Sequence, residues 1–415
     1  MGFLEAYEAA GPGQAQVDLL HEWIGTRTKE VFAELRERRP VLVTPGPTVV
    51  SRYADVQEVL SRHKVFTVGL YAPKMDPVVG PYMLARDSTE INERDKGILQ
   101  AMLRREDLPR VRATVARLAD RAIDEGLEDG RLDVVPWLSR RVPVRLCGEY
   151  FGFPGPDDET MMRWSRTANL DFFFNLADDA ETHARAVAAG EEMRAHLGEL
   201  VARRRSEGDG HDDVLGRLLA SRFPETIGFD DERIVANVMF LLIGGVETVS
   251  GAVVLILDEL LRRPDELARA RRAAEEDDDA RLSDLAWEAL RLNPIFAFVV
   301  RRCEEDYTLA SGTERETRIT AGTLVYASLA SAALDGAEVP DPEQFRLDRP
   351  EHHRNLHFGY GHHLCLCYYL SLVEVPEILK RLLRRGPVRR APGPDGQIDT
   401  KGGPFAERLV VEIGG

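Results

Sequence analysis

Apolar residues recur at helical spacing along most of this chain. The segments that show the pattern are 23–39, 54–66, 96–126, 131–152, 161–176 and 182–208. An apolar stripe with a period near 3.6 residues predicts an amphipathic helix that packs on a core. Two charged segments, 203–213 and 273–279, are expected to be solvated turns between helices.

Strand patterns are fewer and shorter. Residues 41–53 alternate around a Pro-Gly turn and predict a hairpin, and later strand patterns lie at 301–311, 315–328 and 407–413. Residues 67–92 mix glycine, proline and tyrosine, which predicts a long loop. The sequence has no internal repeat and no linker rich in serine and proline. We therefore expect one mainly α domain over residues 1–415, with a small β-rich region.

Composition narrows the class of protein. Hydrophobic residues make up 44% of the chain and charged residues 30%, which is typical of a soluble globular protein. A net charge of −16 disfavours nucleic acid as the main partner, because phosphate binding needs a basic surface. The acidic N-terminus does not resemble an export signal, and four cysteines are too few for a disulfide framework. We expect a cytoplasmic protein.

One apolar run has chemistry at its centre. From Ile234 to Leu257 the only charged residue is Glu247. A run of this length suits a membrane span or a buried helix, and a central carboxylate makes the buried helix the better prediction. Gly244 and Gly245 weaken the helix, and the Thr248 hydroxyl can bond back to the Gly244 carbonyl. The result is a polar notch that can hold an oxygen ligand and relay protons.

A second pattern pairs opposite charges. Glu288 and Arg291 share one helix face, and apolar neighbours suggest that the pair is buried, although exposed pairs of this kind are common. The prolines and acids of residues 339–350 predict an irregular segment, from which Arg349 can reach Glu288.

Residues 356–370, LHFGYGHHLCLCYYL, hold five metal-capable side chains. They are His357, His362, His363, Cys365 and Cys367. The C-x-C spacing suits neither a structural zinc site nor a thioredoxin-type redox pair. A third interpretation uses one cysteine, with Gly359 and Gly361 allowing the backbone to pass close to a flat ligand. A cysteine at the N-terminus of the following helix is favoured as thiolate, and a thiolate below a haem iron promotes O–O cleavage.

In combination these motifs resemble the cytochrome P450 haem-thiolate monooxygenases, over essentially the whole chain. The haem-binding signature F-x-x-G-x-x-x-C is met by Phe358, Gly361 and Cys365. The oxygen-activation signature (A/G)-G-x-(D/E)-T is met by Gly244, Gly245, Glu247 and Thr248. The E-x-x-R signature is met by Glu288 and Arg291, with Arg349 as the third member of the structural triad.

The resemblance implies roles and a cofactor. Cys365 would be the axial ligand of heme b (iron protoporphyrin IX), with Glu247 and Thr248 as the proton relay. His363 and Arg301 match haem-propionate contacts. It also implies separate ferredoxin and NAD(P)H-dependent ferredoxin reductase partners, a small-molecule substrate and no membrane anchor. Candidate residues for a basic ferredoxin surface are Arg104, Arg105, Arg110, Arg112, Lys380, Arg381, Arg384 and Arg385.

Three features depart from the family pattern. Asn92 and Lys96 stand where many soluble members have the H-x-x-x-R pair that binds a propionate. Cys367 stands where the family usually has glycine, which places a second thiol near the ligand. The common Asn-Arg-Asp run is missing from residues 328–345.

The expected activity is insertion of one oxygen atom from O₂ into a small organic, secondary-metabolite-like substrate. Substrate contacts are expected, by family position, from Tyr71, Tyr82, Phe172, Phe173, Phe174, Phe240, Ile295, Phe296 and Phe405. Simple core packing is the alternative for each of these residues. Alternative functions are a peroxide-driven oxidase or an oxidative aromatic-coupling enzyme of the same fold, and a non-catalytic haem-fold binding protein. The intact Glu247–Thr248 pair favours O₂ activation.

Overall fold

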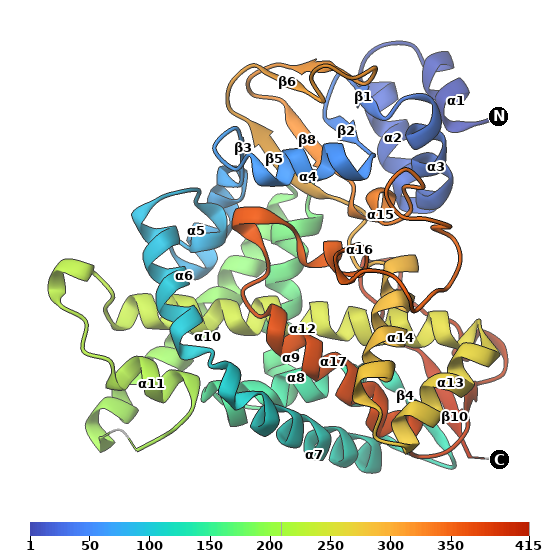
Figure 1. Cartoon of the computed structure of the whole chain (residues 1–415). Helices are drawn as coiled ribbons and strands as arrows, with labels where there is room; N and C mark the ends of the chain where they lie inside the picture. The colour runs from blue at the N-terminus through green and yellow to red at the C-terminus, as the bar shows by residue number, and fades with distance from the viewer. Residues whose placement is uncertain (209, 415) are drawn as a thin grey trace. The chain divides into compact units, whose positions relative to one another are not determined.

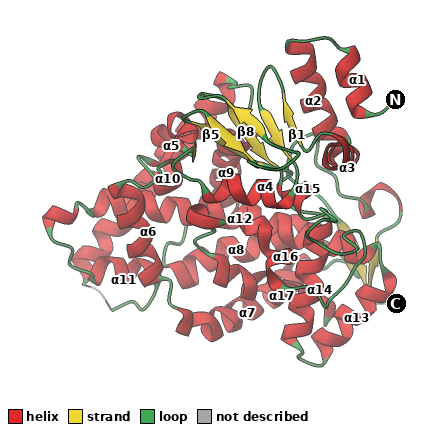
Figure 2. Ribbon diagram, turned by 45° about the horizontal axis from the view of Figure 1, so that its top comes forward, coloured by secondary structure: helices red, strands yellow, loops and turns green. Residues whose placement is uncertain are grey.

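Helices dominate the computed structural model, which describes residues 1–208 and 210–414 (Figures 1 and 2). The chain divides into two compact units, and both are assembled from segments distant in sequence. A β-rich unit contains Met1–Leu70, Arg86–Ser88 and Trp287–Cys365. A helical unit contains Tyr71–Ala85, Thr89–Ala286 and Leu366–Gly415. The single domain that we expected over the whole chain stays a prediction.

The β-rich unit is built on a five-stranded sheet with the strand order β1-β2-β8-β5-β3. These strands are β1 (Val41–Val43), β2 (Thr48–Val50), β8 (Leu324–Ala327), β5 (Val299–Cys303) and β3 (Phe66–Thr67). The predicted hairpin is confirmed: β1 pairs antiparallel with β2, with Val41 opposite Val50. Later strand predictions are also confirmed, because β5 and β8 pair in this sheet and β6 (Tyr307–Leu309) pairs with β7 (Thr317–Ile319).

Helices complete the β-rich unit. They are α1 (Phe3–Ala9), α2 (Gln14–Thr26), α3 (Thr28–Arg38), α4 (Tyr53–Ser61), α15 (Leu329–Ala332) and α16 (Glu351–Asn355). Val56, Val59 and Leu60 of α4 share a buried apolar cluster with strand residues such as Val50 and Val325. Burial of this cluster holds α4 against the sheet.

The helical unit surrounds α12 (Asp231–Leu261), the long helix predicted at 234–257. Helices α9 (Asp158–Asn169), α10 (Ala180–Glu207), α17 (Tyr368–Leu383) and α8 (Arg141–Leu146) pack against α12, and α7 (Leu108–Gly126) packs against α17. Among the described residues α12 alone is long and apolar enough to cross a membrane, but 72% of its most apolar window is buried inside the protein. That burial supports the prediction of a core helix.

The remaining elements frame this bundle. They are α5 (Ala72–Val79), α6 (Glu90–Met102), α11 (Val214–Ala220), α13 (Pro264–Glu275), β4 (Arg131–Asp133), β9 (Val388–Arg390) and β10 (Val410–Ile413). Helix α14 (Asp279–Leu292) begins in the helical unit and ends in the β-rich unit, which resumes at Trp287. β10 lies between β4 and β9 and pairs antiparallel with both, so the strand predicted at 407–413 is confirmed over its second half.

Several predicted boundaries were wrong. Residues 67–92 are not a long loop, because α5 forms there with Met75, Val78 and Val79 buried against α10. The predicted helix 96–126 is two helices, separated at Leu103–Asp107, and Pro109 is in the first turn of α7. A proline fits a first turn but cannot continue a helix in mid-course.

Other predicted helix ends differ from the observed ones because of contacts with distant parts of the chain. The helix predicted at 54–66 ends at Ser61, and Phe66 instead pairs with Cys303 in the sheet. The segment 23–39 contains two helices that meet at Arg27, and 131–152 begins with β4. The predicted turns at 203–213 and 273–279 are shorter than expected, because α10 runs to Glu207 and α13 to Glu275.

Candidate active site

The Cys365 loop is closed by its own backbone. The Cys365 amide donates to the Phe358 carbonyl at 3.0 Å, and the Leu364 amide donates to the Gly361 carbonyl at 3.1 Å. Gly359 and Gly361 have φ of 81° and 69°, which glycine adopts without strain. A Cβ on Gly361 would lie 3.1 Å from the Leu60 carbonyl oxygen, so a side chain would also crowd α4.

Cys365 is half-buried, and its thiol forms no disulfide. One correction concerns the helix that follows: α17 begins at Tyr368, and its N-cap is Cys367 rather than Cys365. The dipole of α17 therefore favours a negative charge more directly at Cys367. An unbridged, half-buried thiol beside two glycines of positive φ fits the single thiolate ligand of a haem.

The histidines of this loop have other contacts. The His363 Nε2 atom lies 2.7 Å from Asp87 Oδ1, a partner that the sequence analysis missed. The His357 ring stacks on Trp287 at 5.3 Å, and the His362 ring stacks on His63 at 4.2 Å. These contacts give no support to the zinc interpretation.

Metal-capable side chains do gather elsewhere in the β-rich unit. Among the described residues, the one group of three or more within ligand distance is Glu338, His352 and His353. Glu338 and His352 are exposed, and only His353 is buried. This group shares no residue with the Cys365 loop.

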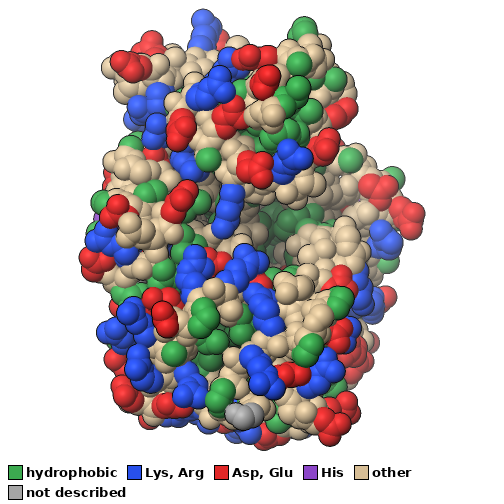
Figure 3. Space-filling view, turned by 90° about the vertical axis from the view of Figure 1, so that its right-hand side faces the viewer, with side chains coloured by type: hydrophobic (Ala, Val, Ile, Leu, Met, Phe, Trp, Pro, Cys, Tyr) green, Lys and Arg blue, Asp and Glu red, His purple; other side chains and the backbone are tan. Residues whose placement is uncertain are grey.

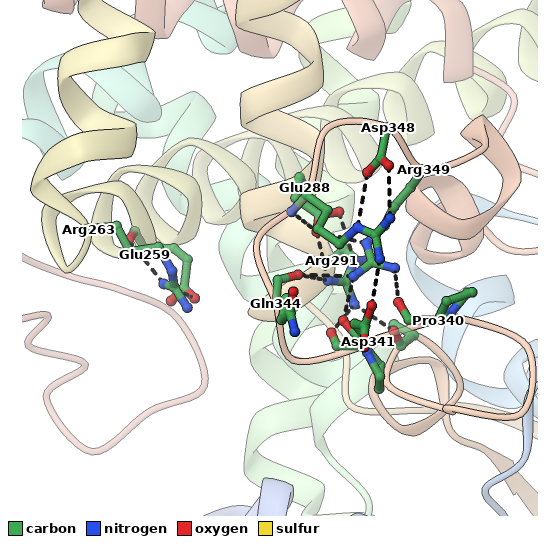
Figure 4. Close-up of polar contacts among 12 residues, drawn as sticks. Glu259, Arg263, Glu288, Arg291, Pro340, Asp341, Gln344, Asp348 and Arg349 are labelled. Atoms are coloured by element: carbon green, nitrogen blue, oxygen red, sulfur yellow. Dashed lines mark hydrogen bonds and ion pairs between the residues drawn. The ribbon is translucent and has the colours of Figure 1, made fainter.

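The predicted charge triad forms, and it is buried (Figure 4). Arg291 donates from Nε and Nη2 to the two carboxylate oxygens of Glu288, each at 2.8 Å. Arg349 Nε donates to Glu288 Oε1 at 3.0 Å. Both pairs are almost fully excluded from solvent, with side-chain exposures between 0% and 2%.

The triad also organises the chain that precedes the Cys365 loop. Arg291 Nη1 donates to the carbonyls of Ala333 and Pro342 at 2.8 and 2.7 Å, and Arg349 Nη2 donates to the Asp341 carbonyl at 2.6 Å. Two guanidinium groups thus hold an irregular segment by its carbonyl oxygens, which a segment without helix or strand cannot satisfy by itself.

In the helical unit, the predicted back-bond of α12 is confirmed. Thr248 Oγ1 donates to the Gly244 carbonyl at 2.6 Å. Phe240, Gly244 and Thr248 are spaced four residues apart and lie on one helix face. The Phe240 ring lies 3.4 Å from the position of a Cβ on Gly244.

Glu247 has a different environment. It is buried, and its Oε2 atom accepts from Arg140 Nε and Nη2 at 3.3 and 3.2 Å. Its Oε1 atom is buried with no hydrogen-bond partner among the described residues. Burial raises the pKa of Glu247 above its ordinary value, and the charge of Arg140 offsets only part of that rise. Such a carboxyl group can be protonated at a higher pH than an exposed glutamate.

Arg140 and its second partner, Glu407, were not among the predicted site residues. Arg140 follows the π-helical turn Val135–Ser139, and Glu407 lies just before β10. Arg140 and Glu247 are 107 positions apart, and Arg140 and Glu407 are 267 apart. No local spacing joins residues so far apart, so only the fold shows the cluster.

The aromatic candidates of the helical unit form a connected set. Tyr82 stacks on Phe240 at 4.1 Å, and Phe240 lies parallel to Phe172 at 6.4 Å. Phe173 contacts Phe172, and the rings of Phe173 and Tyr71 are 5.8 Å apart. Tyr82, Phe172 and Phe240 are buried in the core of the helical unit.

A second aromatic pair joins Phe174 to Phe405 at 5.1 Å. Both rings are half-buried, as are Tyr71 and Phe173. Ile295 and Phe296, which belong to the β-rich unit, are half-buried after the end of α14. The half-buried members of the predicted set remain the better candidates for contact with a ligand.

Three of the residues predicted to contact the haem propionates are buried or half-buried. Asn92 is buried on α6 and its Nδ2 atom donates to the Met83 carbonyl at 2.9 Å, and Lys96 is half-buried one turn later. Arg301 is buried on β5 and its Nη1 atom donates to the Val300 carbonyl at 2.9 Å. The roles of these three residues toward a haem stay predictions.

Comparisons with known proteins agree with this arrangement. The family model described as Cytochrome P450 matches residues 47–395. The mycinamicin IV hydroxylase/epoxidase of Micromonospora griseorubida is 30% identical over 382 residues, covering 88% of this chain and 90% of the relative. The cyclomarin C epoxidase CymV of Salinispora arenicola is 29% identical and covers 99% of each chain.

The fold is also that of a solved structure. The crystal structure of CalO2 superposes with a TM-score of 0.81 at 24% identity, covering 94% of this chain and 97% of CalO2. The family match spans most of the chain and includes the acid–alcohol pair, the triad and the cysteine loop. The chain belongs to the cytochrome P450 family and is a P450 monooxygenase.

Proposed function

We propose that this enzyme inserts one oxygen atom from O₂ into a C–H or C=C bond of a small secondary-metabolite-like molecule. The observation that carries the proposal is the intact acid–alcohol pair of α12, in which Glu247 is buried and Thr248 bonds the Gly244 carbonyl. A binding protein, or an enzyme that uses peroxide alone, has no need of a buried proton donor beside a helix alcohol.

The cofactor of the proposal is heme b, with Cys365 as its axial ligand. When bound, the haem supplies the iron centre at which O₂ is activated. The Cys365 loop supplies the thiol and a backbone shaped by Gly359 and Gly361. His363 and Arg301 are the proposed propionate contacts, with Asn92 and Lys96 in place of the usual pair.

Glu247 and Thr248 have distinct tasks in this reaction. The Thr248 hydroxyl is held by the Gly244 carbonyl, on the helix face that also carries Phe240. Glu247 exchanges a proton at Oε1, the oxygen that has no partner among the described residues. Proton transfer by a positioned carboxyl group typically accelerates a reaction by about 10²–10⁴-fold.

The substrate is proposed to contact the half-buried aromatic rings. Tyr71, Phe173, Phe174 and Phe405 present ring surface, while Tyr82, Phe172 and Phe240 support them. Apolar and aromatic walls bind organic ligands through area buried from water. Two relatives are named for mycinamicin IV and cyclomarin C, so these two compounds are the first probes to try.

Electrons are proposed to come from a separate ferredoxin and its NAD(P)H-dependent reductase, in the cytoplasm. Exposed cations of the helical unit, Arg104 and Arg105, support this proposal because they can attract an acidic ferredoxin.

The first experiment tests the ligand. The purified protein is reduced under carbon monoxide, and we expect the far red-shifted Soret band of thiolate ligation. Cys365→Ser should abolish the band, whereas the matched variant Cys367→Ser should retain it. The reverse result would overturn the choice of ligand.

The second experiment tests the reaction. The loaded enzyme is incubated with ferredoxin, reductase, NAD(P)H and ¹⁸O₂, and compounds that shift the haem from low to high spin are used as substrates. We expect one ¹⁸O atom in the product. Equal product formation from hydrogen peroxide alone, without ¹⁸O from O₂, would favour the peroxide-driven alternative.

A further inference from the structure

Four alternating charges run through the helical unit beside α12. In order they are Glu247, Arg140, Glu407 and Arg166. The first three have side-chain exposures of only 2%, 8% and 7%, whereas Arg166 on α9 is 38% exposed. The cluster therefore starts at a buried carboxylate of the acid–alcohol pair and ends near solvent.

Arg140 is shared unequally between the two glutamates. It donates from Nη1 and Nη2 to the two oxygens of Glu407, each at 3.1 Å, and from Nη2 to the Ala406 carbonyl at 2.8 Å. Toward Glu247 it uses Nε and Nη2, and both reach the same oxygen at 3.2–3.3 Å. The bidentate partner of Arg140 is thus Glu407, and Glu247 is held by one oxygen only.

The position of Arg140 is itself fixed. The hydroxyl of Ser139, the residue before it, lies 2.8 Å from the hydroxyl of Ser250 on α12, and both groups are buried. The Arg140 guanidinium therefore lies between Glu247 of α12 and residues 406–407, and its donors are divided between the two glutamates.

The two carboxyl groups differ in acidity for a physical reason. Burial raises the pKa of both, but hydrogen bonds from Arg140 and Arg166 outweigh burial at Glu407 and leave its pKa below the ordinary value. At Glu247 burial outweighs the same arginines, and its pKa is raised. When the environment moves the pKa values of two neighbouring carboxyl groups apart, one group stays ionised and the other can take up a proton. Here Glu407 is the ionised group and Glu247 is the group that can take up a proton.

We propose that Glu407 is a positioning residue for proton transfer: by binding Arg140 through two hydrogen bonds, it leaves Glu247 Oε1 open to take up and release a proton. The role of Glu247 as proton donor rests on the proposed function, whereas the division of Arg140 between two carboxylates does not. If Glu407 were neutral, Arg140 would donate hydrogen bonds to both carboxylate oxygens of Glu247. Its positive charge would then keep Glu247 ionised.

The test uses Glu407→Gln in the haem-loaded enzyme. Glutamine keeps the shape and one acceptor oxygen but loses the charge that competes for Arg140. The charged groups that act on Glu247 are Arg140, Arg166 and Glu407, so one substitution changes the balance. Glu407→Asp keeps the charge and should behave like the parent enzyme, which guards against a folding defect as the explanation.

The first readout does not depend on turnover. Difference infrared spectroscopy, with Glu247→Gln to identify the band, follows the protonated carboxyl of Glu247 against pH. We expect the midpoint to fall by about one pH unit in Glu407→Gln, because the Arg140 charge then acts on Glu247 alone. An unchanged midpoint would overturn the proposal, even if the enzyme proves to have another activity.

The second readout follows the reaction. In Glu407→Gln we expect product formed per NAD(P)H to fall by about tenfold, the solvent isotope effect to rise and the pH profile to move to lower pH. The reduced carbon monoxide band and substrate affinity should not change. The matched variant Glu412→Gln, which removes a carboxylate paired with Arg389 at 2.8 Å on β10, should leave all of these values unchanged.

The two proposals fail in different ways. A parent enzyme that forms no oxygenated product would contradict the proposed function, and the infrared midpoint would still test Glu407. A parent enzyme with normal turnover and a Glu407→Gln variant with the same coupling and pH profile would contradict the inference alone.

Discussion

Glu374 lies in the middle of α17, and its Oε1 atom is buried with no hydrogen-bond partner among the described residues. Burial alone raises the pKa of Glu374 to about 8. Glu288 is also buried, but two arginines bind it. Glu374 has no such partner to offset the cost of burying a charge.

The stability of the protein should therefore depend on pH through Glu374. Its folded-state pKa of about 8 exceeds the ordinary value of 4.5, so the folded chain holds a proton that the unfolded chain releases between these values. The stabilisation is complete below the unfolded pKa and is lost as pH rises through the folded pKa. Relative to Glu374→Gln, the parent should lose on the order of 1 kcal/mol per pH unit in this window.

Denaturant unfolding of both proteins at pH 5, 6, 7 and 8 measures this difference, with pH values chosen around the window. Glu199→Gln, at an exposed position of α10, controls for the general effect of removing a negative charge. Parallel pH curves for the parent and Glu374→Gln would show that Glu374 is ionised in the folded protein.

The sequence predicted contacts between residues close in the chain, but it did not predict the distant residues that surround the site. The bond from Thr248 to Gly244 follows from a four-residue spacing on one helix, and it formed. The pairing of Glu247 with Arg140 spans 107 positions and depends on how α12 packs against the turn before α8. Local periodicity contains no such information, so the partner that tunes the acid could not be predicted.

At the scale of elements, α14 and the segment 333–349 depend on each other. The segment has no strand between α15 and α16, and its carbonyls are bound by Arg291 and Arg349. Glu288 orients both guanidinium groups and also accepts from the Arg346 amide at 3.0 Å. The two arginines therefore satisfy carbonyl groups of this segment that hydrogen bonds of a helix or a sheet would otherwise satisfy.

Arg349→Met should destabilise the fold strongly. It leaves a buried Glu288 with one cation instead of two and releases the Asp341 carbonyl, and breaking a buried ion pair typically costs about 3–5 kcal/mol. Denaturant unfolding measures the loss, and the fraction of haem retained on a gel-filtration column reports whether the Cys365 loop is affected. Because Arg291 still binds Glu288, we expect the low end of that range.

Arg346→Met is the matched control for this change. Arg346 lies three positions away, and its side chain pairs with Asp341 and Asp348 at the surface. Its contact with Glu288 uses the backbone amide, which the substitution keeps. Equal losses for the two variants would contradict the role of the buried triad.

Element types were predicted more reliably than their ends. The long apolar run became α12, and the hairpin at 41–53 formed as β1 and β2. The helix α5 was missed because Gly69, Pro73, Pro77 and Gly80 favour turns, whereas packing of its apolar face on α10 favours a helix. Tertiary contacts of this kind outweigh local preference and are invisible in a short window of sequence.

At the scale of the molecule, charge is distributed without a single dominant sign on the face that Figure 3 shows, where basic and acidic side chains are interspersed. Most of the cations predicted to bind ferredoxin form ion pairs with acidic residues of the helical unit. Lys380 pairs with Asp277 and Asp279, Arg384 with Asp277, and Arg385 with Asp124, each at 2.7 Å. Paired cations contribute little net potential for an acidic partner.

Arg104 and Arg105 differ from the others. Both are exposed, and the Arg105 guanidinium lies 3.6 Å from the centre of the exposed Tyr369 ring, near the start of α17. An aromatic ring orients the cation without neutralising it. Of the eight predicted basic residues, these two are therefore the ones best placed to attract an acidic ferredoxin.

Removal of the charges of Arg104 and Arg105 should slow electron delivery from an acidic ferredoxin. Arg104→Gln/Arg105→Gln should raise the ferredoxin KM on the order of tenfold at low salt, because long-range attraction controls association of charged proteins. The difference should shrink in ~0.5 M salt, where the Debye length falls to a few ångströms. The matched pair Arg384→Gln/Arg385→Gln removes the same charge from residues bound to acids and should change KM much less. Ferredoxin titrations of NAD(P)H-supported haem reduction at two salt concentrations decide the matter. Equal effects of the two double variants would mean that net charge, rather than the Arg104–Arg105 surface, directs the partner.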